Sequence, residues 1–138
     1  MYEYKVKVLR VVDGDTIDVD VQLGFDVILS KQRVRLHGID TPESRTRNKE
    51  EKIRGLLSKD YLKDICYVGS VIRLQSKERG KFGRILGIIY KDGDTISINQ
   101  KMIDDGFAVP YTGGNKEELE ALHMKNKQKL IEKGLLEE

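Results

Sequence analysis

Cations and carboxylates gather in one short stretch of this sequence, Arg-Val-Arg-Leu-His-Gly-Ile-Asp-Thr-Pro-Glu at 33–43. The stretch lies at the end of an apolar strand pattern and beside a proline turn. A strand end holds its side chains in fixed directions while the turn stays open, which suits a site that acts on charged groups. An edge strand with solvated charges would show the same composition. This stretch alone therefore does not decide between a site and a solvated surface.

A second candidate lies in Val-Asp-Gly-Asp-Thr-Ile at 12–17, which nearly recurs as Lys-Asp-Gly-Asp-Thr-Ile at 91–96. Asp-Gly is typical of tight turns, so the recurrence indicates two hairpin turns with the same chemistry. Asp13 is accordingly expected to be a turn residue. Local sequence does not separate Asp15 from Asp94 as candidate site residues, and only the wider set of motifs can do so.

Three motifs in this order resemble the thermonuclease (staphylococcal nuclease) family: Val-Asp-Gly-Asp-Thr at 12–16, Arg-Leu-His-Gly-Ile-Asp-Thr-Pro-Glu at 35–43 and Gly-Lys-Phe-Gly-Arg at 80–84. Each motif is short, but their order, spacing and residue identities make the combination specific. The resemblance implies a five-stranded OB-fold barrel with about three helices, a bound Ca²⁺ ion, and endonucleolytic hydrolysis of DNA and RNA that leaves 3′-phosphates. The alternative is an OB-fold module that binds nucleic acid without cutting it.

The resemblance assigns a metal site to three residues of this chain. Asp15 and Asp40 resemble the family's metal-binding carboxylates, and Thr41 would add its backbone carbonyl oxygen. Hard oxygen ligands of this kind suit Ca²⁺, with water in the remaining positions. Asp94 matches an ordinary hairpin of the family, so the resemblance separates it from Asp15 and implies a structural role.

Catalytic roles are implied for Arg35, Glu43 and Arg84. Glu43 resembles the proposed general base, which would reach the water shell of the metal. Arg35 and Arg84 resemble two phosphate-binding arginines, whose permanently charged guanidinium groups would stabilise the transition state more than the ground state. His37 faces the same side as Arg35, but histidine is not the base in this family and is expected to be a bystander.

The residues that would hold the substrate depart from the family pattern. Lys81, Phe82 and Tyr111 match substrate-binding positions, but Phe82 replaces a tyrosine of the staphylococcal enzyme and lacks its hydroxyl. A second nucleotide-flanking tyrosine of that enzyme falls near Gly113 here, so base stacking would rest on fewer aromatic rings. The segment between Asp15 and Arg35 is also longer, which predicts an extended hairpin around 24–32 near the substrate side.

Basic residues outside these motifs form two groups. A cationic rim that guides a polyanion, or a merely solvated surface, would account for the first group: Arg45, Arg47, Lys49, Lys52 and Arg54, with Lys77, Arg79 and Lys81. The lysines of the last helix, at 125, 127, 129 and 133, are expected to be solvated. His123 is expected on the surface of that helix.

Hydrophobic periodicity predicts the elements that must position these residues. Strands are expected at 2–12, with a bulge near Val8–Leu9, and at 17–23, 31–39, 71–76 and 85–90, with a further apolar alternation at 96 and 98. Helices are expected at about 50–66 and 99–105 and in a last segment that Asn115 and Glu118 open and Gly134 closes. This order suits a mainly β (α+β) fold in which twisted antiparallel strands form a small, partly open barrel.

Bulk properties set the remaining bounds. The length of 138 residues fits one domain, 1–138, and the formal net charge of +2 does not by itself identify a nucleic-acid binder. Cys66 is the single cysteine, so no internal disulfide forms, and an inert thiol is expected. The sequence has no signal-peptide or membrane-spanning pattern, which suits a cytoplasmic protein, or a secreted one if a leader was trimmed. Small size favours a monomer.

Overall fold

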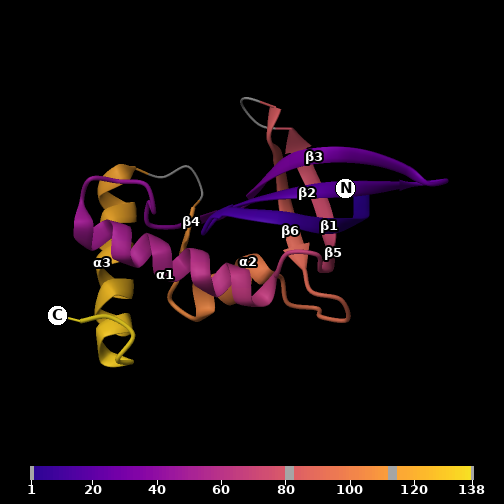
Figure 1. The fold of residues 1–138 in the computed structure, drawn as a ribbon. Coiled ribbons are helices and arrows are strands. Elements are labelled where there is room, and N and C mark those ends of the chain that lie inside the picture. The colour runs from indigo at the N-terminus through magenta and orange to yellow at the C-terminus, as the bar shows by residue number, and fades with distance from the viewer. Residues whose placement is uncertain (1, 80–82, 112–114, 138) are drawn as a thin grey trace.

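A closed barrel forms the centre of the computed structural model, which describes residues 2–79, 83–111 and 115–137. The barrel strands are β1 (Tyr2–Asp13), β2 (Thr16–Gly24), β3 (Val27–Leu36), β5 (Val71–Arg79) and β6 (Ile85–Tyr90), in the spatial order β1-β2-β3-β6-β5 (Figure 1). The predicted five-stranded barrel of an α+β fold is therefore confirmed. The expectation of a partly open, wholly antiparallel barrel is wrong, because β3 pairs with β6 in parallel and closes it. A long crossover separates these two strands, as parallel pairing requires.

Three helices are described: α1 (Lys49–Ile65), α2 (Ile98–Asp104) and α3 (Lys116–Glu132). Each begins at a polar N-cap side chain that accepts a backbone N–H three residues ahead: Asn48, Ser97 and Asn115. Ile98 starts α2, so the apolar alternation at 96 and 98 belongs to no strand. The helices lie toward one end of the barrel in Figure 1. No helix in the described ranges combines the length and the apolar character needed to cross a membrane.

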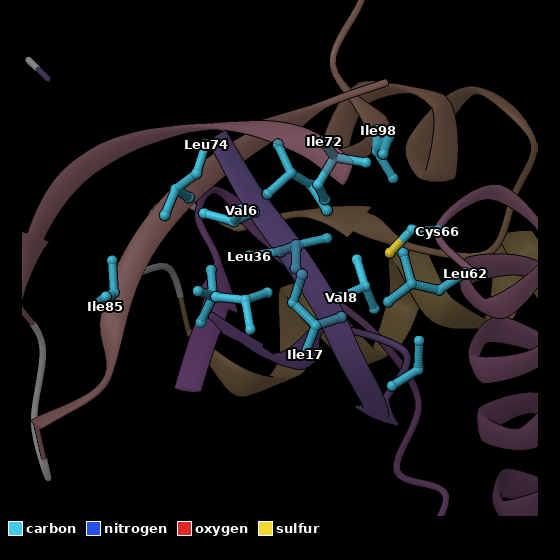
Figure 2. Close-up of a cluster of buried hydrophobic side chains, with 14 of the residues drawn as sticks. Val6, Val8, Ile17, Leu36, Leu62, Cys66, Ile72, Leu74, Ile85 and Ile98 are labelled. Carbon is cyan, nitrogen blue, oxygen red and sulfur yellow. The ribbon is translucent and has the colours of Figure 1, made fainter. Parts of the chain in front are cut away.

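The core fills the barrel with aliphatic side chains from the inward positions of each strand. Val6, Val8, Ile17 and Leu36 have no exposed surface, and Figure 2 shows them with Leu62 and Cys66 of the α1 region and with other buried side chains. Burial raises the pKa of the Cys66 thiol to about 12, so the thiolate needed for reactivity is not formed near neutral pH. The expectation of an inert thiol is consistent with this burial.

A bulge shifts the face that β1 presents to the core. The register between β1 and β2 shifts between Val8 and Arg10, which confirms the bulge predicted from the change of apolar parity at Val8–Leu9. Val8 points into the barrel before the bulge and Val11 after it. The bulge therefore lets β1 keep its apolar side chains facing the core on both sides of the bulge, up to the turn at Asp13.

The predicted strand at 31–39 is two strands. β3 ends at Leu36, and Gly38 turns the chain with a φ of 80°. The chain then forms β4 (Ile39–Asp40), which leaves the barrel and pairs with β7 (Val109–Pro110) in a separate two-stranded ladder. A left-handed φ is accessible to glycine without strain, so this position permits the change of direction. Asp40 is consequently attached to the helical side of the molecule and not to the barrel wall.

The β2–β3 hairpin extends past the barrel, as the longer 16–34 segment predicts. Its turn lies at Phe25 and Asp26, whose φ values of 52° and 62° are typical of a two-residue hairpin turn. Large apolar side chains stay exposed along it, including those of Leu23, Phe25 and Ile28. In Figure 1 this hairpin projects away from α3.

Candidate active site

The turn at Asp13–Thr16 carries the first candidate residue, Asp15. The Gly14 N–H donates to the Asp13 carboxylate (2.9 Å), so Asp13 is the turn residue that was predicted. The backbone carbonyl of Asp15 accepts from the N–H of Leu36 (2.8 Å), which ties the turn to the end of β3. The Thr16 hydroxyl donates to the Asp15 carboxylate (2.9 Å) and orients it.

Gly14 lets this turn lie directly against the segment after β4. A Cβ at Gly14 would lie 2.9 Å from the Cβ of Ser58 and 3.1 Å from the Oγ1 of Thr41, closer than side-chain atoms normally approach. Thr41 is 5% exposed. The contact brings the turn of Asp15 against the chain that carries Asp40 and Thr41, two segments that lie in different sheets.

Arg35 lies between the two candidate metal-binding carboxylates. Its Nη2 is 3.4 Å from Oδ2 of Asp15 and 3.9 Å from Oδ1 of Asp40. The same guanidinium donates to the backbone carbonyls of Leu36 (2.7 Å) and Ile39 (3.0 Å), which wrap around it at the β3–β4 turn. Its side chain is 18% exposed. Asp15, Arg35 and Asp40, separated by up to 25 positions, thus converge on one point.

The cluster carries more negative charge than Arg35 offsets. Burial raises the pKa of Asp15, and the nearby carboxylates of Asp13 and Asp40 add to that effect, while Arg35 and the Thr16 hydrogen bond oppose it. The pKa of Glu43 is also raised, by burial first and then by Asp13, Asp15, Glu51 and Asp40. Carboxylates that disfavour one another's ionised form indicate a place where a further cation would be stabilised.

His123 contacts this cluster, so the expectation that it lies on the surface of the last helix is wrong. Its Nε2 lies 2.8 Å from Oδ2 of Asp40, and its side chain is 13% exposed. Leu119, His123, Asn126 and Leu130 recur at helical spacing, and all four are intermediate or buried on a helix whose other residues are mostly exposed. That spacing was the signal for a packed face, but the many charged residues of the helix conceal it.

The loop that carries Glu43 rests on the backbone of α1. A Cβ at Gly55 would lie 2.4 Å from the carbonyl oxygen of Glu43 and 2.6 Å from the N of Ser44. Only glycine permits an approach of this kind. Helix and loop therefore meet backbone to backbone, while the Glu43 side chain is left exposed at the surface.

A cleft of about 610 Å³ opens between α1, α3 and the segment after β4. Asp40, Thr41 and Glu43 line it together with residues of the two helices, namely Asn48, Glu50, Glu51, Arg54, Lys116, Leu119, Glu120, His123 and Met124. Arg54 is 6% exposed and donates two hydrogen bonds to Glu50 (2.7 and 3.1 Å), so its inclusion in an exposed cationic rim is wrong. Lys127 of α3 also contacts Glu50 (3.3 Å), against the expectation of a solvated lysine.

Arg84 lies in a different recess. This hollow of about 540 Å³ is lined by Asp18, Lys31, Arg33 and Arg84, and none of these four lines the cleft of Asp40. Arg84 directly precedes Ile85, whose register partner on β3 is Val34, so it enters the sheet beside Arg33. The structure thus brings Asp15, Arg35, Asp40, Thr41 and Glu43 together. Arg84 lies outside this group, beside Arg33 at the start of the neighbouring strand β6.

The predicted substrate-binding residues are only partly described. Lys81 and Phe82 lie outside the described residues, as does Gly113. Tyr111 follows β7, where its backbone N–H donates to the carbonyl of Gly38 (2.8 Å), and 41% of the residue is exposed. An exposed ring near the β3–β4 turn suits stacking, and the role of all three residues stays a prediction.

The molecule is an OB-type barrel with a partly buried arginine near the end of its third strand, flanked by carboxylates. The family model described as staphylococcal nuclease homologue matches residues 33–135. The chain therefore belongs to the staphylococcal nuclease family, and the resemblance drawn from its three motifs is confirmed.

Individual relatives agree with this assignment. The chain is 32% identical over 118 residues to a micrococcal nuclease of Shigella flexneri, covering 79% of this chain and 59% of that protein. It is 31% identical over 108 residues to a thermonuclease of Staphylococcus hyicus (77% and 59%), and 29% identical over 116 residues to endonuclease YhcR of Bacillus subtilis (79% and 9%). The chain thus spans about three fifths of the first two relatives and about a tenth of the third.

Proposed function

We propose that this protein is a Ca²⁺-dependent endonuclease that hydrolyses phosphodiester bonds of DNA and RNA and leaves 3′-phosphates. The observation that carries the proposal is the position of the Arg35 guanidinium between Asp15 and Asp40. Relatives whose names are micrococcal nuclease, thermonuclease and endonuclease support the reaction class.

The residues around Arg35 suit a hard divalent cation. Asp15 and Asp40 turn one oxygen each toward the same point, and the pKa values of Asp15 and Glu43 are raised by burial first and by neighbouring carboxylates in addition. Asp15, Asp40 and the carbonyl of Thr41 would hold the ion. The described residues contain no group of three His, Cys, Asp or Glu side chains arranged around one point, so water would complete the coordination. When bound, Ca²⁺ would neutralise the phosphate and hold the attacking water.

Arg35 would bind the scissile phosphate. Its guanidinium is held by two backbone carbonyls and so needs no reorganisation when the substrate arrives. Two of its N–H groups already serve those carbonyls, and the rest can donate to phosphate oxygens. Because negative charge builds up on these oxygens during attack, the fixed donors stabilise the transition state more than the bound substrate.

Glu43 would accept the proton of the attacking water. Its side chain is exposed and its pKa is raised, and a carboxylate of higher pKa is the stronger base. Water then attacks phosphorus, the bond from phosphorus to the 5′-oxygen breaks, and that oxygen takes a proton from solvent and leaves as a 5′-hydroxyl. Arg84, in the adjoining recess, would supply the second cation to the phosphate.

Cleavage assays with matched variants test the proposal. The unmodified protein, Glu43→Gln and Glu132→Gln are incubated with plasmid, single-stranded DNA and RNA, in Ca²⁺ or in a chelator. Glu132 is an exposed glutamate at the end of α3, so Glu132→Gln controls for the loss of one charge. We expect cleavage only with Ca²⁺ and a loss of at least about 100-fold in Glu43→Gln alone. Binding without cleavage under any divalent cation would instead establish a nucleic-acid-binding module.

A further inference from the structure

The recess beside the proposed active site is rich in hydrogen-bond donors from basic side chains. It lies on the outward side of β2 and β3, since Asp18 and Arg33 are register partners whose neighbours Ile17 and Val34 are buried in the core. Three cations, Lys31, Arg33 and Arg84, line it with one carboxylate. The formal charge of its lining is therefore positive, in contrast to the carboxylate-rich cleft beside it.

Asp18 fixes Arg33 without using all of its donors. The carboxylate accepts from Nε (2.9 Å) and Nη2 (3.2 Å), which leaves Nη1 available in the part of the chain that the structure describes. The Arg33 side chain is 49% exposed. A guanidinium held along one edge and open at the other can bind an oxyanion without first being ordered.

A bulge in the extended hairpin aims Lys31 at this recess. The register of β2 and β3 shifts between Val19 and Val21, opposite Lys31, and the Lys31 backbone has a φ of 52°. Its N–H donates to the carboxylate of Asp20 (2.9 Å), which holds this left-handed conformation. Bulges redirect the side chains they carry. The extension of the hairpin therefore contributes a cation to the recess in addition to lengthening the strands.

Arg84 adds a hydrogen-bond donor that has no acceptor among the described residues. This donor is its Nε, which is buried. A buried donor without an acceptor is unfavourable and is usually satisfied by water, an ion or a ligand. The recess thus combines the buried Nε of Arg84, the open edge of Arg33 and the redirected side chain of Lys31. Together these donors suit an anionic hydrogen-bond acceptor.

We propose that Lys31 and the open edge of Arg33 bind a non-scissile phosphate of the substrate strand in this recess, next to the scissile phosphate at Arg35 and Arg84, and that Lys31 determines how strongly this second phosphate is bound. Arg33 and Arg35 occupy alternate positions on the same face of β3, about 7 Å apart along the strand. A polynucleotide with one phosphate at Arg35 can therefore place a neighbouring phosphate in the recess. This inference rests on the proposed function for the identity of the ligand. It predicts a preference for longer strands over minimal substrates.

Binding without catalysis tests the inference independently of cleavage. Lys31→Ala and Lys31→Glu are compared with Lys63→Ala and Lys63→Glu, which change the net charge equally at an exposed lysine of α1. The probe is a labelled single-stranded oligonucleotide of about 12 nucleotides, within the length that one OB fold covers. Affinity is measured in a chelator at several salt concentrations.

We expect Lys31→Ala to weaken binding about three- to tenfold and to reduce the slope of log affinity against log salt by about 0.7, the contribution of one phosphate contact on a single strand. Lys31→Glu should weaken binding further. In cleavage assays, Lys31→Ala should raise KM more for the oligonucleotide than for a dinucleotide. The Lys63 variants should match the unmodified protein in all three measurements.

Two results would overturn the inference. The first is that the Lys31 and Lys63 variants have the same affinity and the same salt slope. The second is that submillimolar inorganic phosphate displaces the oligonucleotide from the unmodified protein but not from Lys31→Ala, which would assign the recess to free phosphate. Absence of cleavage by the unmodified protein would refute only the proposed function, because the binding comparison in chelator still decides the role of Lys31.

Discussion

Asp-Gly-Asp-Thr-Ile occurs at 13–17 and again at 92–96, and the two copies end in different surroundings. The first copy joins β1 to β2, and its second aspartate, Asp15, faces Arg35 with a side chain that is 15% exposed. The second copy joins β6 to α2, and its Asp94 forms an ion pair with Lys101 at 38% exposure. Identical local chemistry thus yields a candidate ligand in one place and a surface ion pair in the other.

The electrostatics of the two aspartates run in opposite directions. Burial is the largest influence on Asp15 and raises its pKa. The hydrogen bond from Lys101 is the largest influence on Asp94 and lowers its pKa. The segment opposite the turn therefore decides the role of the aspartate. Asp15 meets β3 and the chain after β4, whereas Asp94 meets Lys101 of α2 through its carboxylate and Arg73 of β5 through its backbone carbonyl.

The largest expected difference between the two copies is in cleavage activity when each carboxylate is removed in turn. Asp15→Asn is expected to lower Ca²⁺-dependent cleavage by at least about 100-fold, because it removes a negative ligand that Asn replaces poorly. Asp94→Asn should leave cleavage within about twofold of the unmodified protein. Steady-state rates on single-stranded DNA check both, and equal losses in the two variants would contradict the division of roles.

The cations that face the two aspartates offer the next test. Arg35→Lys keeps the charge but loses the planar fork that contacts two carbonyls and two carboxylates, so we expect a loss of about 10- to 100-fold in kcat/KM. Lys101→Arg keeps a surface ion pair and should be neutral. A fully active Arg35→Lys would show that charge alone suffices at this position.

The two glycines of the copies serve different purposes and should respond differently to alanine. Gly14→Ala forces a Cβ against Ser58 and Thr41, an overpacking that costs about 1–3 kcal/mol of unfolding free energy. Gly93 has open space around it but a φ of 82°, so Gly93→Ala costs about 1 kcal/mol of backbone strain. Denaturant unfolding measures both. Cleavage should fall only in Gly14→Ala, because only that turn touches the site.

The smallest effect concerns pH in the metal-free protein. Because the folded-state pKa of Asp15 is raised, ionisation of Asp15 destabilises the fold, and stability falls as pH rises from its unfolded to its folded pKa. Asp94 has the opposite sign: its stabilising contribution is present above its unfolded pKa and is lost as pH falls through its lowered folded pKa. In chelator, Asp15→Asn should therefore melt at a higher temperature than the unmodified protein near neutral pH, and Asp94→Asn at a slightly lower one. If Asp15→Asn melted at a lower temperature than the unmodified protein and Asp94→Asn at a higher one, the pKa directions given for these two aspartates would be wrong.

Much of the barrel could be predicted from side-chain alternation, since apolar parity marks the inward face of a strand whatever its partner is. The bulge at Val8–Leu9 shows this most clearly, because it is visible as a change of parity. The break after Leu36 was not visible, because Ile39 continues the apolar alternation while Gly38 turns the backbone. The parallel closure of β3 on β6 pairs Val34 with Ile85, 51 positions further along the chain, and no local pattern encodes it.

Some residues of the candidate site could likewise be predicted from the sequence, and others could not. The residue types and order of the three motifs led to Asp15, Arg35, Asp40, Thr41 and Glu43, which the structure brings together. His123 could not be placed correctly, because its partner Asp40 lies in β4. Arg54 pairs with Glu50 of its own helix, but its burial depends on the residues of α3 that lie beside it. A charged residue at a packed helical position looks like a solvated one until its partner from another segment is known.

Gly55 has a consequence for the motions of the protein. Since α1 and the loop of Glu43 touch through their backbones, the loop cannot open outward alone without leaving a gap against the helix. Loop and helix should therefore open as one cooperative unit, with similar protection of their amides against hydrogen exchange. Glu43, the proposed general base, would then sit on a segment as rigid as a helix, and the timing of the proposed catalysis would not depend on loop fluctuations.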